Sequence, residues 1–371
     1  MFPFVGDSVG GSHQSIIELH RNLTKRNILS FIVVHKKGPL SLMLDKSEIK
    51  YIYFPLDTLA GASPNLFSIA YSILRNFIII RRFIKENNVS IVHGNDLRIN
   101  LTWSLPTRFS KAAYVWHQRS LMSSSKLWML SIVMADHFVA ISKFVYNSLP
   151  NNIARSKKNL ILNPFNTKSQ YDRASSREWL NDQYNIPKED ILIGYIGRIV
   201  HWKNIDFLVE CFAKYIQKDS SALHLIIVGS GDYEYIEKIK QILGKLDIKN
   251  DVTLAGFNSS PDRVISGFDL MIAPSNQEPF GRTLVEAMLQ HTPVLACKGA
   301  GHSEIIDDGK TGSLYAHNNI DDFVKKCTMS INDELCKSRI VKKAYIMASS
   351  KYSSDRHTES IIKIYNQLLF S

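Results

Sequence analysis

Cysteine is scarce in this 371-residue chain, and long apolar runs are absent from it. The four cysteines all lie in the second half without Cys-x-x-Cys spacing, which argues against a disulfide framework and favours buried free thiols. The longest apolar runs span only a few residues, such as residues 77–80, whereas a membrane-spanning helix needs roughly 18–20. Asp7 and several glycines stand where a signal peptide would be apolar. We therefore expect a cytoplasmic protein.

Acidic residues are scarce in the first half. Residues 1–165 contain 20 lysines and arginines but only 8 aspartates and glutamates, a net charge of +12, whereas the remaining residues carry 25 and 26. This asymmetry predicts an anionic partner: a nucleic acid, an acidic membrane surface or a phosphate-bearing substrate. No recognised nucleic-acid-binding motif accompanies the charge, so we do not expect nucleic acid.

Two basic segments of the first half also carry apolar and aromatic side chains. The first, with Arg75, Arg81, Arg82 and Lys85, includes residues 77–80 and Phe83; in the second, Arg119 and Lys126 lie near Leu121, Met122 and Trp128. This mixture suits a peripheral contact with an anionic membrane. A core-packed helix with a solvated basic face is an equally good interpretation of the first segment.

Short apolar runs alternate with helical spacing in the second half. Residues 191–196 form an apolar run that ends at Gly197, the pattern of a buried parallel strand. Apolar residues then recur at helical spacing at Ile205, Leu208, Val209, Phe212 and Ile216. Further strands are predicted at residues 223–228, 252–257, 269–273 and 293–297. Such alternation predicts a parallel sheet, because parallel strands need a crossover connection.

The first half repeats this alternation less regularly. Helices are predicted around residues 16–23 and 64–85, and strands at residues 29–34, 89–93, 112–116 and 138–141. Only residues 1–5 precede Gly6, and Pro3 interrupts them, so we expect either a short first strand or a true start upstream of Met1. A polar segment runs from Asn163 to Pro187, and we place the domain boundary at its start. The length and the 45% apolar content then fit two α/β domains, each with its own core.

Two loops that follow predicted strands carry groups that suit an anionic ligand. Ligands of open parallel sheets bind beyond the carboxyl ends of the strands. After the first strand of the second domain, Gly197 lets the backbone approach a ligand, and Arg198 and Lys203 could converge on one diphosphate. Taken alone, the two cations are more simply explained as solvated surface groups.

The second loop follows residues 269–273 and contains two carboxylates eight residues apart, Glu278 and Glu286. Backbone N–H groups around residues 281–285 would lie at the positive end of the next helix, which favours anionic or hydroxyl-rich ligands. The carboxylates could accept hydrogen bonds from sugar or ribose hydroxyls. The alternative is that Glu278 stabilises the helix dipole and Glu286 is solvated.

One ordered set of motifs resembles that of the retaining glycosyltransferases of family 4. It consists of Gly197-Arg198, then Lys203, then Glu278-x₇-Glu286 with Phe280-Gly281 between the two glutamates. Those enzymes have the GT-B fold, an α/β architecture of two Rossmann-like domains that face each other across a cleft. The resemblance covers nearly the whole chain and extends to Gly10-Gly11, Ser142, Asn163-Pro164, Gly229-x-Gly231 and the stretch from Glu304 to Gly312. It implies an acceptor-side domain at residues 1–165, a nucleotide-sugar-binding domain at 166–350, and a helix at 351–371 that packs back toward the first domain.

The resemblance also implies roles for individual residues. Arg198 and Lys203 would bind the donor diphosphate and stabilise the leaving nucleotide, and Glu286 would hold the ribose hydroxyls. Glu278 would contact the transferred sugar, helped by main-chain groups at Phe280, Gly281, Thr283, Leu284 and Val285. Gly10 and Gly11 would let the first loop close over the diphosphate, and His117 would be the active-site histidine near the donor sugar. A lone histidine after a strand is otherwise more often structural. Ser12-His13 departs from the family, in which an acidic residue often continues the glycine loop.

Several features bear on metal use and mechanism. The chain has no Asp-x-Asp sequence, no His-x-x-x-His and no cysteine cluster, so we expect a reaction that needs no metal and no other cofactor. Negative charge would build up on the leaving diphosphate, where preorganised cations are worth several kcal/mol in a dry site. For retention, the family is usually discussed as attacking from the leaving-group face, and we expect no covalent Glu278 intermediate.

The sequence thus predicts a retaining hexosyltransferase that uses a nucleotide-sugar donor. By analogy with the family, the acceptor is a lipid-linked glycan in bacterial surface polysaccharide assembly, such as O-antigen, lipopolysaccharide or capsule, at the inner face of the cytoplasmic membrane. Two alternatives remain: a nucleotide-sugar 2-epimerase of related fold, and a sugar-nucleotide-binding subunit without catalysis.

Overall fold

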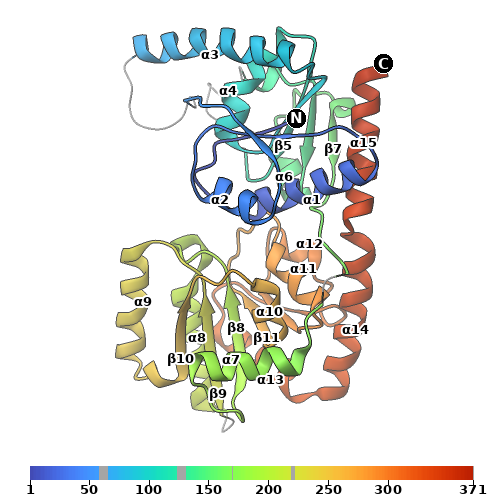
Figure 1. Cartoon of the computed structure of the whole chain (residues 1–371). Coiled ribbons are helices and arrows are strands. Elements are labelled where there is room, and N and C mark those ends of the chain that lie inside the picture. The colour runs from blue at the N-terminus through green and yellow to red at the C-terminus, as the bar shows by residue number, and fades with distance from the viewer. Residues whose placement is uncertain (58–65, 123–130, 169, 219–221, 371) are drawn as a thin grey trace. The chain divides into compact units, whose positions relative to one another are not determined.

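The computed structural model describes residues 1–57, 66–122, 131–168, 170–218 and 222–370, with the backbone alone for residues 66–73 (Figure 1). The chain divides into two compact units. The first is Met1–Phe165 together with Ser354–Ser371, and the second is Asn166–Ser353. Lys126 and Trp128 lie outside the described residues. Among the described helices, none is long and apolar enough to cross a bilayer.

The first unit is built on parallel strands. They are β1 (Phe2–Phe4), β2 (Ile32–Val34) and β3 (Tyr51–Tyr53) in one set, and β4 (Ile91–Gly94), β5 (Ala113–Gln118), β6 (His137–Ala140) and β7 (Lys158–Leu160) in the other, each set in that spatial order. The two sets meet at Met1, whose carbonyl accepts a hydrogen bond from the His93 amide at 3.0 Å. The first strand is short, as the sequence predicted.

Helices pack on these strands through their apolar faces. They are α1 (Gly11–Lys25), α2 (Pro39–Lys46), α3 (Leu66–Glu86), α4 (Leu97–Arg108), α6 (Lys143–Ser148) and α15 (Ser354–Phe370), with one 3₁₀ turn, η1 (Arg155–Lys157). The C-terminal helix α15 packs on α1: Ile361 and Ile364 join the core that contains Ile16 and Leu19. Arg26 at the end of α1 lies 3.1 Å from Asp355 of α15. The predicted return of this helix to the first unit is therefore confirmed.

The second unit contains one six-stranded parallel sheet. Its strands are β8 (Ile191–Ile196), β9 (Leu223–Val228), β10 (Val252–Gly256), β11 (Leu270–Ala273), β12 (Val294–Cys297) and β13 (Ser313–Tyr315), in the order β10-β9-β8-β11-β12-β13. The strand order reverses between β8 and β11, which lie side by side. The five strands that the sequence predicted in this unit are present, and β13 was not predicted.

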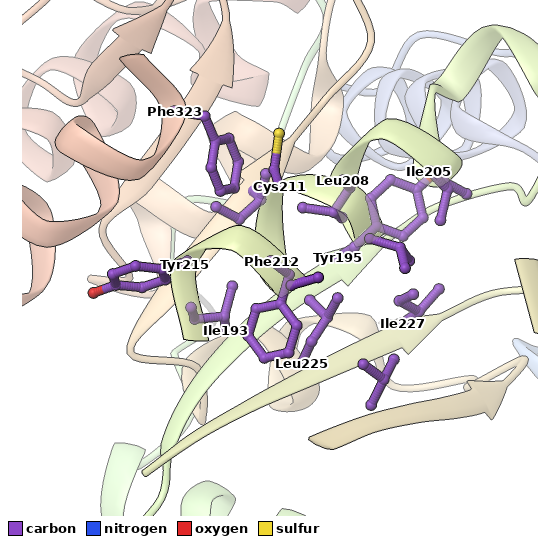
Figure 2. Close-up of a cluster of buried hydrophobic side chains, with 14 of the residues drawn as sticks. Ile193, Tyr195, Ile205, Leu208, Cys211, Phe212, Tyr215, Leu225, Ile227 and Phe323 are labelled. Carbon is purple, nitrogen blue, oxygen red and sulfur yellow. The ribbon is translucent and has the colours of Figure 1, made fainter. Parts of the chain in front are cut away.

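The helices of the second unit are α7 (Arg173–Tyr184), α8 (Ile205–Lys218), α9 (Tyr233–Lys245), α10 (Pro261–Ser266), α11 (Arg282–Leu289), α12 (His302–Ile305), α13 (Ile320–Asn332) and α14 (Glu334–Lys351), with 3₁₀ turns η2 (His201–Lys203) and η3 (Lys249–Asp251). Figure 2 shows how α8 covers the sheet: Leu208 and Phe212 of the helix lie over Ile193 of β8 and Leu225 of β9. All four side chains are at most 1% exposed. This apolar face at i and i+4 spacing explains why the segment is a helix.

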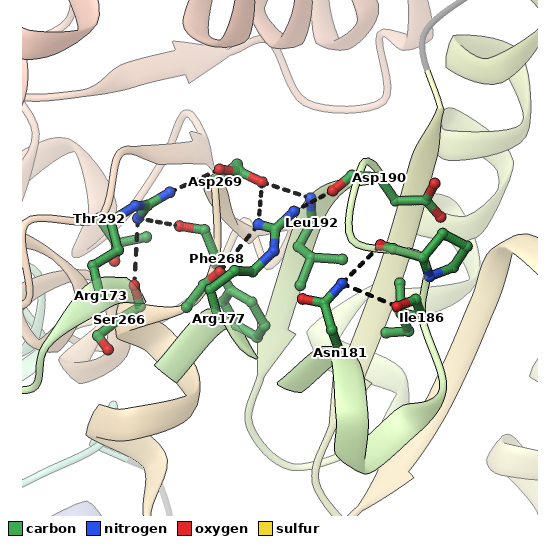
Figure 3. Close-up of polar contacts among 12 residues, drawn as sticks. Arg173, Arg177, Asn181, Ile186, Asp190, Leu192, Ser266, Phe268, Asp269 and Thr292 are labelled. Atoms are coloured by element: carbon green, nitrogen blue, oxygen red, sulfur yellow. Dashed lines mark hydrogen bonds and ion pairs between the residues drawn. The ribbon is translucent and has the colours of Figure 1, made fainter. Parts of the chain in front are cut away.

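A polar clasp ties α7 to the amino ends of β8 and β11 (Figure 3). Asp269, just before β11, accepts hydrogen bonds from Arg173 at 2.7 Å, from Arg177, and from the Leu192 amide of β8 at 2.8 Å. Arg177 also donates to the Asp190 carbonyl. The sequence suggested only a polar segment here. Residues 173–184 are instead a helix, because Asp172 caps its first turn by accepting from the Ser175 amide at 2.7 Å and Leu180 is fully buried.

Candidate active site

The carboxyl end of β8 passes into a tight turn that packs on the loop after β9. A side chain at Gly229 would place its Cβ only 1.8 Å from the Gly197 carbonyl oxygen, and one at Gly231 would lie 1.9 Å from the Ile199 carbonyl oxygen. Only glycine fits these positions, which gives a structural reason for the Gly229-x-Gly231 pattern. The Tyr195 hydroxyl donates to the Arg198 carbonyl at 2.8 Å and fixes the start of the turn.

Two side chains from neighbouring strands meet at this end of the sheet. Lys203, in η2 after β8, forms an ion pair with Glu278, in the loop after β11, and their side chains are 18% and 16% exposed. The Lys203 ammonium also lies 4.3 Å from the centre of the Trp202 ring, and the Arg198 guanidinium lies 5.7 Å from the same ring. Because β8 and β11 flank the point where the strand order reverses, this pair occupies the position where doubly wound sheets bind ligands.

The loop between β11 and α11 presents a helix amino end beside that pair. Gly281, at φ +101°, caps α11 without a side chain, and a Cβ there would lie 2.9 Å from His302. The side chains of Leu284 and Val285 are fully buried, so they can contribute to a ligand site only through the main chain. Glu286 lies one turn into α11, 3.3 Å from Arg282. Uncapped N–H groups at a helix start form a favourable environment for an anion.

Two titratable groups near these carboxylates are perturbed. Burial is the main reason that the pKa of His302 falls to about 4, so its imidazole is neutral near pH 7. Burial, followed by the nearby charge of Glu286, raises the pKa of Asp262 to about 6. Perturbed groups of this kind cluster at functional sites, although structural networks produce them too.

The structure brings some of the predicted residues of the second unit together and leaves others at the margin. Lys203, Glu278 and Thr283 line one small pocket with Tyr195, Ser275 and His302. Arg198 is exposed and does not line this pocket; its guanidinium lies near the Trp202 ring, and its carbonyl accepts from the Tyr195 hydroxyl. Glu286 does not line that pocket. Phe280 is buried, and its ring lies 5.7 Å from Tyr352.

The predicted residues of the first unit lie after β1 and near the end of β5. Gly10 caps α1, and its amide donates to His13 Nδ1 at 3.0 Å; Gly11 is the first residue of that helix. His13 therefore caps the start of α1, and burial lowers its pKa, which favours the neutral ring that accepts this hydrogen bond. His117 is 1% exposed, and its Nδ1 lies 3.1 Å from His93 Nε2 and 3.3 Å from Arg119 Nη2.

Four residues near these carboxylates were not predicted: Tyr195, Ser275, His302 and Asp262. Ser275 donates to the Trp202 carbonyl at 3.0 Å and thereby ties the loop after β11 to the turn after β8. In sequence, His302 lies two residues before the stretch from Glu304 to Gly312, which does not by itself connect it to the site. Its packing against Gly281 does so. Within the described residues, no group of three or more His, Cys, Asp or Glu side chains could hold a metal ion.

Comparison with known proteins decides the family. The profile of the glycosyl transferases group 1 matches residues 176–347, the segment that holds Arg198, Lys203, Glu278 and Glu286. This segment of the chain belongs to the glycosyl transferases group 1 family. The resemblance that the sequence motifs indicated is therefore confirmed for the family.

Curated proteins are also similar to this chain. Over 187 residues it is 29% identical to the poly(ribitol-phosphate) alpha-N-acetylglucosaminyltransferase of Staphylococcus aureus (strain COL), an alignment that covers 49% of this chain and 37% of that protein. It is 24% identical to an uncharacterized 41.2 kDa protein in the cps region of Klebsiella pneumoniae, with 84% of each chain covered. Across the first four curated relatives, the chain spans 37% to 64% of the relative's length.

Solved structures extend the likeness to the full chain. A glycosyltransferase from Rickettsia africae ESF-5 superposes with a TM-score of 0.86 at 23% identity, covering 100% of this chain and 98% of the other. Anabaena Alr3699/HepE in complex with UDP-glucose superposes with a TM-score of 0.84 at 19% identity, covering 99% and 98%. At these identities the likeness shows the fold, and the predicted α/β class with two Rossmann-like domains of the GT-B type is confirmed.

Proposed function

We propose that this chain transfers a hexose-type sugar from a nucleotide-sugar donor to a glycan acceptor with retention of configuration. One observation carries the proposal: the Lys203–Glu278 pair lies beside the uncapped start of α11, where the strand order reverses, inside the segment that matches the family. A cation, a carboxylate and the amino end of a helix at one point suit a ligand that is both anionic and rich in hydroxyls.

In this proposal the diphosphate of the donor binds to Arg198 and Lys203. Arg198 is exposed, and Lys203 already neutralises one partly buried carboxylate. When a diphosphate enters, Lys203 gains a second anionic partner. The two cations then stabilise the negative charge that develops on the leaving nucleotide, which is the largest electrostatic change in the reaction.

The carboxylates bind hydroxyl groups. Glu286, near the start of α11, holds the ribose, and Glu278 contacts the transferred sugar with help from the main chain of Phe280, Gly281 and residues 283–285. The perturbed His302 and Asp262 lie beside these carboxylates and support the assignment of this region as functional. His117 of the first unit stays a prediction as the histidine near the donor sugar, as do the roles of Gly10, Gly11 and Gly197.

A UDP-sugar is the first donor to test. Among the similar proteins, Alr3699/HepE has structures with UDP and with UDP-glucose, and the lipopolysaccharide outer core galactosyltransferase WaaB matches 99% of this chain at a TM-score of 0.70. A capsular polysaccharide biosynthesis glycosyltransferase of Staphylococcus aureus is 24% identical over 245 residues. These relatives support an acceptor in bacterial surface polysaccharide synthesis, in which the growing glycan is carried on a lipid.

The first unit supplies a basic and apolar surface that fits a membrane-borne acceptor. Arg81, Arg82 and Lys85 of α3 line a pocket with Lys111, Phe109 and Leu369, and Phe109 is 56% exposed. The apolar side chains of α3 differ in exposure. Ile78 is exposed, whereas Phe83 is buried and its ring centre lies 4.4 Å from that of Phe54. Exposed apolar groups beside cations suit an anionic lipid surface.

The test is a panel of UDP-, GDP-, ADP- and dTDP-sugars with EDTA present, followed by nucleotide diphosphate release and thermal stabilisation. We expect one donor to give slow hydrolysis and a clear thermal shift. Glu278→Gln should abolish release, whereas Glu210→Gln on the exposed face of α8 should not. Release that disappears with EDTA would refute metal independence. Silence from every donor would instead favour a binding subunit without catalysis.

A further inference from the structure

Three histidine rings from three elements are stacked inside the first unit. His93 of β4 and His117 of β5 have ring centroids 5.2 Å apart at 24°, and His357 of α15 lies 6.1 Å from His117 at 15°. All three side chains are at most 3% exposed. Hydrogen bonds continue the stack: Tyr365 Oη of α15 lies 2.6 Å from His93 Nδ1, and His93 Nε2 lies 3.1 Å from His117 Nδ1.

One member of this network can only donate, and it fixes the direction of the rest. The Arg119 guanidinium has no acceptor, and its Nη2 lies 3.3 Å from His117 Nδ1. Arg119 is itself held by the side-chain oxygens of Asn95, at 2.8 Å, and Asn163. His117 Nδ1 must therefore accept, so the proton of a neutral His117 ring is on Nε2.

The same reasoning passes along the chain of hydrogen bonds. Because His117 Nδ1 accepts, His93 Nε2 carries a proton and donates to it. A neutral His93 then accepts at Nδ1, and the Tyr365 hydroxyl donates there. Burial, reinforced by the Arg119 charge, lowers the pKa of both His93 and His117 well below the usual value, which keeps both rings neutral.

We propose that Tyr365, His93 and Arg119 are positioning residues that hold His117 in the Nε2–H tautomer, so that it offers one fixed donor to the sugar. The inference rests on the proposed function and adds to it a role for the C-terminal helix, which supplies Tyr365. His117 Nε2 is buried and has no hydrogen-bond partner among the described residues. A buried donor left unpaired is costly, and a substrate hydroxyl would satisfy it.

The opposite polarity is chemically conceivable and makes a different prediction. If Tyr365 accepted from His93 Nδ1–H, His93 Nε2 would have to accept from His117 Nδ1–H. That proton would point at the Arg119 guanidinium, so two donors would face each other across 3.3 Å. His117 Nε2 would then be an acceptor and could not donate to a hydroxyl.

Nitrogen-15 NMR of the histidine rings tests the tautomer without any substrate. The His117 resonances are assigned by their loss in His117→Gln. We expect a protonated Nε2 and a pyridine-like Nδ1 on His117, and the same arrangement on His93. A protonated Nδ1 on His117 would overturn the proposal, whatever the activity of the enzyme.

Variants then test whether the network acts through His117. His93→Leu removes the donor and should lower kcat for sugar transfer roughly tenfold to a hundredfold, the range seen when a supporting hydrogen bond is lost, with little change in donor KM. His93→Gln keeps an N–H donor and should recover much of this loss. Tyr365→Phe, which removes only the hydroxyl, should leave His117 in the Nε2–H tautomer, because Arg119 still donates to its Nδ1, and should give a smaller fall in kcat.

The control is His137→Leu on β6, another buried histidine, whose ring bonds to Asn159 at 2.7 Å instead of to the stack. It should lower stability and leave the His117 tautomer and kcat unchanged. An equal loss of kcat in both leucine variants would show that His93 is merely structural. Failure of the proposed function is distinguishable, because it would remove activity from the wild type while the NMR result stands.

Discussion

The Lys203–Glu278 pair allows a prediction in which stability and ligand affinity change in opposite directions. Lys203 forms an ion pair with Glu278. If the donor diphosphate binds to Lys203, the carboxylate competes with it. Glu278→Gln should therefore strengthen binding of a nucleoside diphosphate while it abolishes sugar transfer, and Lys203→Met should weaken that binding.

The magnitudes follow from the burial of the pair. Breaking a fully buried ion pair costs about 3–5 kcal/mol, because a charge is left without a partner. Here the side chains are 18% and 16% exposed, so we expect about 1–3 kcal/mol of lost stability for Lys203→Met and less for Glu278→Gln. A freed lysine should improve diphosphate affinity by about 1 kcal/mol, roughly fivefold.

A double-mutant cycle measures these terms. Urea unfolding gives the free energies of the wild type, both single variants and the double variant, and calorimetry gives the nucleoside diphosphate affinities. The double variant should be more stable than Lys203→Met alone, since it has no unpaired carboxylate. Lys214→Met, on an exposed position of α8, is the control for loss of a lysine. A Glu278→Gln variant that binds the diphosphate more weakly than the wild type would refute competition for Lys203.

Three further predictions concern stability, each measured by urea unfolding. Asp262→Asn should stabilise the protein at pH 7 by roughly 1–2 kcal/mol and lose this gain between about pH 6 and 4, because the folded pKa of about 6 lies above the ordinary 3.8 and ionisation opposes folding. The effect of His302 on stability has the opposite pH dependence, because its pKa in the folded protein, about 4, lies below the ordinary 6.5. Its contribution to the free energy of unfolding is fully present above pH 6.5 and is lost as the pH falls toward 4. His302→Gln should therefore make stability less dependent on pH in this range. Asp269→Asn should cost about 2–3 kcal/mol by loosening the clasp of α7; a loss no greater than that of Asp321→Asn, on an exposed pair, would contradict this role.

The strands that the sequence did not reveal are short and lie at the edges of sheets. The strands β3, β7 and β13 have three residues each, too few for a periodic pattern. All three residues of β3 are at least partly exposed, so its side chains carry no burial signal. Helix α7 escaped prediction because its stability comes from arginine contacts with distant carbonyls and Asp269, which no local pattern encodes.

Topology explains which part of the site was predictable. Lys203 and Glu278 are 75 residues apart in sequence, but each follows a strand next to the reversal of strand order, and strand ends there converge. His302 and Asp262 come from α12 and α10. Their place beside the carboxylates depends on packing, so no local sequence pattern points to them.

The charge of the first half has a different meaning once its residues are placed. Lys111 lies just before β5, in the pocket with the arginines of α3, whereas His117 lies near the other end of that strand. At about 3.3 Å per residue, roughly 20 Å separates the two, which is twice the screening length at 0.1 M salt. These cations therefore contribute little to any charge near His117, where Arg119 is held by neutral amides and neutral rings. We therefore predict that the excess positive charge serves a second anionic partner at the opposite end of the sheet. Changing Arg81, Arg82 and Lys85 to glutamine should weaken binding to vesicles of anionic lipid and leave donor hydrolysis unchanged; a matched loss of hydrolysis would contradict this separation.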